Sequence, residues 1–224
     1  RGPLFALTFL IMVVGLLRHV VVQGYLLAGS EARRQGTQWR RVLGDSAAWL
    51  VPVRHLVRGT LLLTVASFAF HVGAIVTMLL FEGHVALWEG YLGVNLPAVG
   101  AGTADALTLV ALICGMALLA YRIAVPRARQ LSGAKDYAVL VVTLLPFLTG
   151  YLAAHPAYSP LPWTHTLLLH VLSGELLFLT IPFSKLAHMV LFPFVRISPV
   201  YWHLQPGAGA EAAQALYGKP GRSS

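Results

Sequence analysis

Five long apolar runs constrain the fold of this chain more than any other feature of its sequence. A helix needs roughly 20 predominantly apolar residues to cross the hydrocarbon core of a bilayer. Charged residues make up only 11% of the chain, whereas a soluble domain carries about 25%. We therefore expect an all-α membrane protein, a bundle of five transmembrane helices. The approximate spans are Leu4–Leu27, Gly59–Phe81, Ala104–Val125, Tyr137–Ala154 and His165–Phe194.

The runs also suggest how the chain is divided. We expect one five-helix membrane domain over residues 1–204, followed by a C-terminal tail over residues 205–224 that is rich in Gly and Ala. The first run is too long for the core of a signal peptide, and no small-residue cleavage site follows it, so we expect it to be retained as a span. Pro182 lies inside the fifth run and predicts a kink there.

Basic residues alternate between the loops. Lys and Arg occur after the first, third and fifth runs and are missing from the loops after the second and fourth. Because cytoplasmic loops are enriched in Lys and Arg, this pattern predicts an outside N-terminus and an inside C-terminus. The net charge of +8 therefore reflects membrane orientation, and we expect no nucleic acid partner. The residues behind the pattern are Arg33, Arg34, Arg40, Arg41, Arg54, Arg127, Arg129, Lys135, Arg196, Lys219 and Arg222.

Two histidines of the fifth run, His170 and His188, are spaced as ligands at two membrane depths. Eighteen residues make five full helical turns, so both would lie on one face. They would be roughly 27 Å apart, close to the hydrocarbon thickness. Gly174 and Ser184, each one turn from one of these histidines, would leave room for a flat macrocycle. The pattern favours haem ligation, although two histidines hydrogen-bonding across helices would also account for it.

The second run offers the matching pair, His71 and His84. They are thirteen residues apart, which is about 220° of rotation on a straight helix, so we expect a tilt or distortion near Gly83. His55, sixteen residues before His71, is the competing candidate. Cys114 is the only cysteine, which excludes a Cys-x-x-Cys-His haem attachment on this chain.

The predicted topology decides how the histidines pair. The second run goes from inside to outside and the fifth from outside to inside. His84 should therefore pair with His170 at the outer surface, and His71 with His188 at the inner surface. Neutral imidazole is a common ligand of haem iron. Two histidines on one iron leave no open position, so such a haem transfers electrons.

The histidine-bearing segments also resemble a known family. The stretch HVLSGELLFLTIPFSKLAH, residues 170–188, resembles the fifth helix of the gamma subunit of respiratory nitrate reductase. It also resembles the membrane cytochromes b of sulfite-reduction-linked, heterodisulfide-reductase-type and hydrogenase-linked complexes. In that family two histidines of this helix bind two haems b, and a Pro-Phe-Ser-(Lys/Arg) segment precedes the second, as residues 182–185 do here.

The second run carries a weaker resemblance. FHVGAIVTMLLFEGHVALWEG, residues 70–90, is similar to the second-helix segment of divergent family members. In nitrate reductase itself the two histidines of this helix lie closer together, which argues against a nitrate reductase partner.

The resemblance implies a membrane electron-transfer subunit of a larger oxidoreductase. Such a subunit would hold two haems b and pass electrons between menaquinone or ubiquinone and a partner catalytic, iron–sulfur or cytochrome subunit. We expect it in a bacterial or archaeal cytoplasmic membrane, active as part of a complex and not as an enzyme alone. Glu82, beside His84 on the acidic outer side, is the candidate acceptor for quinol protons.

Two other functions remain open from the sequence. One is a proton or metal transporter that uses its intramembrane histidines. The other is a haem-free membrane anchor for a peripheral enzyme. Haem content per chain distinguishes both from a cytochrome.

Overall fold

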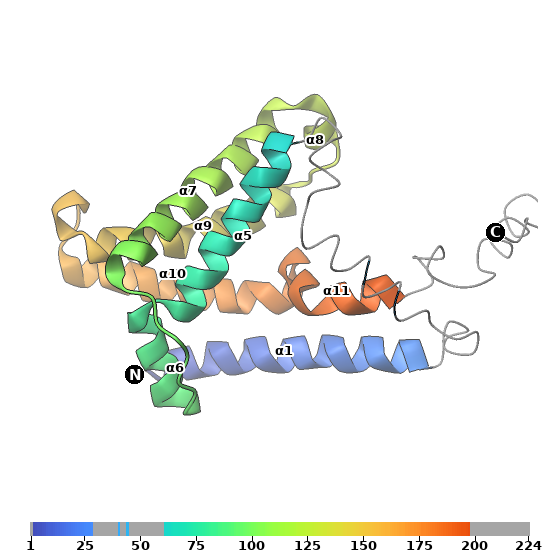
Figure 1. The fold of residues 1–224 in the computed structure, drawn as a ribbon, viewed down its shortest axis with the longest axis horizontal. Helices are drawn as coiled ribbons and strands as arrows, with labels where there is room; N and C mark the ends of the chain where they lie inside the picture. Colours follow the sequence, from blue (N-terminus) through green and yellow to red (C-terminus); the bar gives the residue numbers. More distant parts are fainter. Residues whose placement is uncertain (1, 29–39, 41–43, 45–60, 198–224) are drawn as a thin grey trace, which may run out of the picture. The chain divides into compact units, whose positions relative to one another are not determined.

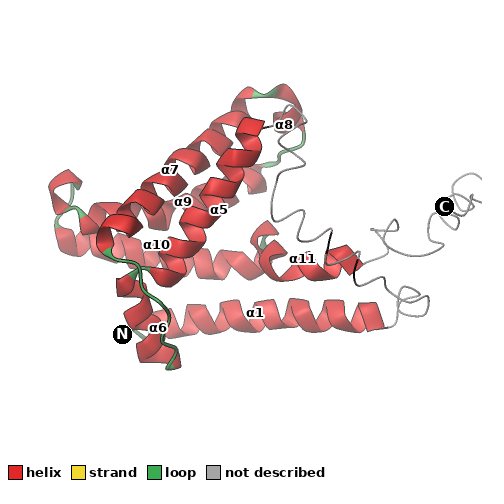
Figure 2. Cartoon of the chain, viewed as in Figure 1, coloured by secondary structure: helices red, strands yellow, loops and turns green. Residues whose placement is uncertain are grey.

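The computed structural model describes residues 2–28, 40, 44 and 61–197. His55, His203 and the tail at 205–224 lie outside the described residues. The described part is helical, as Figure 2 shows, and contains no strand, only one isolated bridge between Phe81 and Val99.

Five of its helices are long and apolar enough to cross a membrane. They are α1 (Pro3–Ala28), α5 (Leu61–Leu80), α7 (Ala101–Ala124), α9 (Ala134–Ala154) and α10 (Trp163–Phe183), labelled in Figure 1. Lipid offers no hydrogen-bond partners to the backbone, and an α-helix pairs its own N–H and carbonyl groups. The prediction of an all-α, multi-pass membrane protein with five spans is confirmed.

Shorter helices connect or follow these spans. They are α6 (Glu82–Leu92), α8 (Pro126–Gln130), η1 (Pro156–Tyr158), η2 (Lys185–Ala187) and α11 (His188–Ile197).

The fifth predicted span is broken into pieces, and this corrects the expectation of one helix from His165 to Phe194. Helix α10 stops at Phe183, one residue after Pro182. Ser184 is extended, with φ −131° and ψ −177°, and its side chain accepts a hydrogen bond from the Leu186 N–H. A proline lacks the N–H for the helical ladder, and a serine cap starts a new turn. The argument that placed His170 and His188 on one face of a single straight helix is therefore wrong.

The second predicted span is also interrupted, at Phe81. Helix α5 ends at Leu80, and Phe81 is extended, with φ −60° and ψ 133°. Helix α6 begins at Glu82 and turns away from α5 (Figure 1). The expected distortion of this span is confirmed. It lies at Phe81, two residues before Gly83.

The chain divides into two compact units. Unit 1 holds residues 1–8 and 55–180, and unit 2 holds residues 9–54 and 181–224. The core of unit 1 brings α5, α7 and α9 together through Phe70, Ala111, Leu144 and Phe147. Small residues let these helices approach closely, as is common in membranes: a Cβ on Gly73 would meet the Leu107 carbonyl oxygen at 2.6 Å.

Candidate functional site

The imidazole rings of His84 in α6 and His170 in α10 lie beside each other in unit 1. Their centroids are 6.0 Å apart, and their planes are 18° from parallel. Both side chains are half-buried. The structure thus brings together the two histidines of the predicted outer pair, which are 86 positions apart in the sequence.

Each ring is held by a backbone carbonyl through the same nitrogen. The Nδ1 of His84 lies 3.0 Å from the carbonyl oxygen of Thr77, and the Nδ1 of His170 lies 3.0 Å from that of Pro146. A carbonyl can only accept, so Nδ1 carries the proton and a neutral ring has its lone pair on Nε2. This is the arrangement found in most metal-ligating histidines.

The break in the second span positions His84. The Thr77 carbonyl accepts the Phe81 N–H at 3.3 Å, and because the chain turns after Phe81 the His84 ring reaches the same oxygen. Main-chain bonds hold the break: the Val99 N–H donates to the Leu80 carbonyl at 2.7 Å, and the Glu82 N–H donates to the Val99 carbonyl at 3.2 Å. Burial lowers the pKa of His84, with the backbone bond to Thr77 opposing the shift, so the ring stays neutral at neutral pH.

A second polar contact joins the helices that carry His170 and Pro146. The Ser173 hydroxyl donates to the His170 carbonyl at 2.9 Å and lies 3.0 Å from the Thr149 hydroxyl of α9. The register of α10 against α9 is therefore held within one turn of the histidine.

The predicted inner pair is divided between the two units. His71 belongs to unit 1 and His188 to unit 2. Both side chains are exposed, and each bonds locally through Nδ1: His71 to the Ser67 carbonyl at 2.7 Å, and His188 to the Lys185 carbonyl at 2.8 Å. Their pairing stays a prediction. The competing candidate, His55, is not among the described residues.

Other histidines use their ring nitrogens differently. The Nε2 of His155 lies 3.3 Å from a carboxylate oxygen of Asp105, and its Nδ1 bonds to the Tyr151 carbonyl. His19 bonds through Nε2 to the carbonyl of Pro182. Both histidines have an Nε2 contact, whereas the carbonyl contacts of His84 and His170 use Nδ1.

The remaining predicted site residues have distinct surroundings. A Cβ on Gly174 would meet nothing within 4 Å, so there is open space one turn from His170. Ser184 caps η2. Glu82 is exposed in the first turn of α6. Glu175 is buried in α10, 6% exposed, and its Oε2 has no hydrogen-bond partner in the part of the chain that the structure describes.

The sequence analysis missed three groups beside these histidines. They are the carbonyls of Thr77 and Pro146, and Gly150 of α9, which lies against the ring of His170. A backbone carbonyl has no sequence signature. Pro146 and Gly150 did carry a signal, because a proline and a glycine four residues apart in an apolar helix usually have a packing reason.

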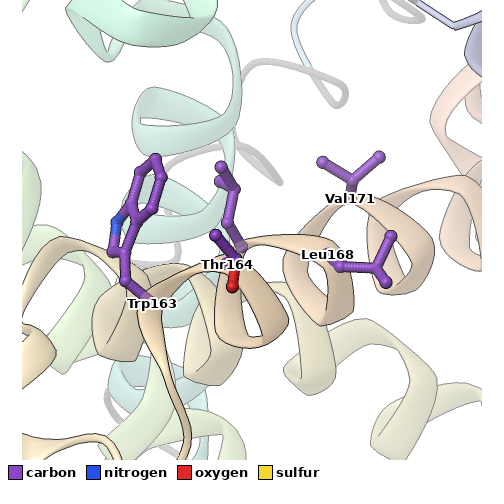
Figure 3. Close-up of a pocket in the computed structure, with 5 residues that line it drawn as sticks. Trp163, Thr164, Leu168 and Val171 are labelled. Atoms are coloured by element: carbon purple, nitrogen blue, oxygen red, sulfur yellow. The ribbon is translucent and has the colours of Figure 1, made fainter.

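Among the described residues, no three or more His, Cys, Asp or Glu side chains come together as a metal site. Figure 3 shows a shallow pocket of about 280 Å³ on α10, lined by Trp163, Thr164, Leu167, Leu168 and Val171. Thr164 is its one polar residue, and the pocket does not include His170.

Comparison with known proteins gives one relative and no stated activity. The chain is 34% identical over 201 residues to a protein of Nitratidesulfovibrio vulgaris that is named only "Protein". The match covers 85% of this chain and 86% of the relative, so the chain belongs to the same family as that protein. No protein-family model matches the chain, and no solved structure does.

Proposed function

We propose that this chain is a dihaem cytochrome b, the membrane electron-transfer subunit of a quinone-linked oxidoreductase. The observation that carries the proposal is the geometry of His84 and His170. Two rings from different helices lie 6.0 Å apart between centroids, each with its Nδ1 on a carbonyl.

His84 and His170 are close enough to each other to be ligands of one haem iron. The rings lie nearly parallel, and each has its Nδ1 on a carbonyl, so both would offer Nε2 to the iron of a bound haem. Haem iron takes its other four ligands from the porphyrin, so two histidines are a complete protein contribution. The open space at Gly174, one turn from His170, fits a flat group at that level.

The residues of the outer site have separable tasks. His84 and His170 would bind the iron, and the Thr77 and Pro146 carbonyls would orient the two rings. A bis-histidine haem passes single electrons and has no open iron position for oxygen chemistry. Quinol oxidation also releases protons, and Glu82 on the outer side remains the proposed acceptor, with buried Glu175 as the alternative.

The proposed orientation, inner haem ligands and partners rest on the sequence. The proposed topology has the N-terminus outside and the C-terminus inside, from the Lys and Arg pattern. His71 and His188 are the proposed inner ligands. The proposed partners are a quinone and a catalytic or electron-carrying subunit in a bacterial or archaeal cytoplasmic membrane. The family resemblance of the two histidine-bearing segments supports this placement.

The decisive experiment is to measure haem on the purified full-length chain in detergent. We expect a reduced-minus-oxidised spectrum of b type, with about two haems per chain, and reduction by a quinol analogue. A chain expressed with an adequate haem supply that binds none would contradict the proposal. In that case the His84–His170 pair would be an aromatic contact, and an anchor or transporter would be favoured.

A further inference from the structure

The ring of His170 lies against the backbone of α9 at a position that only glycine permits. A Cβ built on Gly150 would lie 2.8 Å from Cε1, 3.0 Å from Nδ1 and 3.5 Å from Nε2 of this ring. Real Cβ atoms are essentially never closer than 3.0 Å to such a neighbour. Any side chain at position 150 would therefore displace the imidazole.

The same glycine also exposes the carbonyl that His170 uses. In a helix the carbonyl of one residue points toward the residue four positions later, so the carbonyl of Pro146 points toward Gly150. The missing side chain leaves this oxygen open to a group from outside α9. The Nδ1 of His170 occupies that position, 3.0 Å from the oxygen.

The contact between Ser173 and Thr149 fixes how α10 meets this surface. Thr149 precedes Gly150, and its hydroxyl lies 3.0 Å from that of Ser173, close enough for a hydrogen bond between the two helices. Since both helices are tied beside the histidine, the ring cannot escape a new side chain by a simple slide of α10.

We infer that Gly150 and the carbonyl of Pro146 form a niche on α9 that sets the orientation of the His170 imidazole as an iron ligand. Gly150 is a positioning residue, because it acts on the iron only through His170. The inference rests on the proposed function, since it assigns a role within the outer haem site.

The test compares two Gly→Ala variants of the full chain. Gly150→Ala places a methyl group against His170. Gly102→Ala, in α7, places one where nothing lies within 4 Å, so it makes the same substitution in a membrane-spanning helix without a new contact. Haem per chain, the low-temperature spectrum and the electron paramagnetic resonance of each haem are then measured.

We expect Gly150→Ala to alter the resonance of the outer haem and to weaken its binding about 10- to 100-fold, the usual effect of disturbing a ligand's support. The inner haem and all signals of Gly102→Ala should stay unchanged. If the wild type holds haem and Gly150→Ala leaves both haem signals unchanged, the inference fails while the proposed function stands. A wild type without haem overturns both.

A third variant covers the case in which Gly150→Ala does not accumulate in the membrane. The double variant Gly150→Ala with His170→Ala has no ring for the new methyl group to meet. It should accumulate as well as His170→Ala alone. If the double variant also fails while His170→Ala accumulates, the cost arises elsewhere in α9, and the niche is not its cause.

Discussion

The Nε2 of His19 lies 2.7 Å from the carbonyl oxygen of Pro182, within unit 2. This carbonyl is available because α10 ends at Phe183. The Leu186 N–H, which would bond to it in a continuing helix, bonds instead to the Ser184 hydroxyl at 3.2 Å. His19 therefore replaces a missing helical hydrogen bond, a structural role within a membrane span.

We predict that His19→Ala keeps both haems and lowers the stability of the protein. The lost bond leaves the Pro182 carbonyl without its partner, which costs about 1–3 kcal/mol. Haem content and the thermal unfolding temperature in detergent measure the two effects. His165→Ala is the matched control, because His165 is an exposed histidine of α10. Loss of a haem in His19→Ala would mean that this residue is a ligand.

We predict that His84→Ala and His170→Ala remove the same haem. The two rings are neighbours in the structure, so either change should leave an incomplete ligand pair and the same spectral loss. Low-temperature spectra and haem per chain compare the variants. Two variants that lose different haems, or one that loses none, would contradict the pairing.

The predicted topology gives a matching prediction for the inner pair of histidines. His71→Ala and His188→Ala should both lose the second haem and keep the outer one. His55→Ala should keep both. If His55→Ala loses the inner haem and His84→Ala loses nothing, the ligands of the second span are His55 and His71 instead.

Two substitutions of Ser184 distinguish the two roles proposed for its side chain, which are to cap η2 and to leave space for a haem. Ser184→Ala keeps the space but removes the acceptor of the Leu186 N–H, so we expect a loss of about 1 kcal/mol in stability with both haems bound. Ser184→Leu fills the space and should also lower the haem content. Unfolding temperature and haem content of the two variants decide whether the small side chain matters for haem.

We predict that Glu175 lowers the stability of the protein and has a functional role instead. Its Oε2 is buried without a partner among the described residues. Glu175→Met should therefore stabilise the protein by about 1–3 kcal/mol and raise its unfolding temperature. If Glu175 accepts quinol protons, the same change should slow haem reduction by a quinol analogue in stopped-flow measurements. Glu82→Gln is the comparison, because Glu82 is exposed: slowing only in Glu82→Gln would assign the role to Glu82.

The sequence predicted the spans well because a 20-residue apolar run is a local signal. It also predicted a distortion between His71 and His84, because the rotation between them fits no straight helix. The break after Phe183 was missed, since a proline near a helix end can kink or stop it, and the Ser184 cap decided between these outcomes. The pairing of His84 with His170 followed from topology. The niche at Gly150 did not, because it depends on which face of α9 packs against α10.

The attachment of Val99 to the break at Phe81 has a consequence for how this protein can evolve. The attachment uses main-chain N–H and carbonyl groups alone, and those groups are the same for almost every amino acid. The loop before α7 can therefore drift widely in composition without moving His84. Proline at position 99 is the exception, because it would remove the N–H that bonds to Leu80. Sequence change in this loop is therefore free to alter the surface beside α7 while the His84 ring keeps its place against the Thr77 carbonyl.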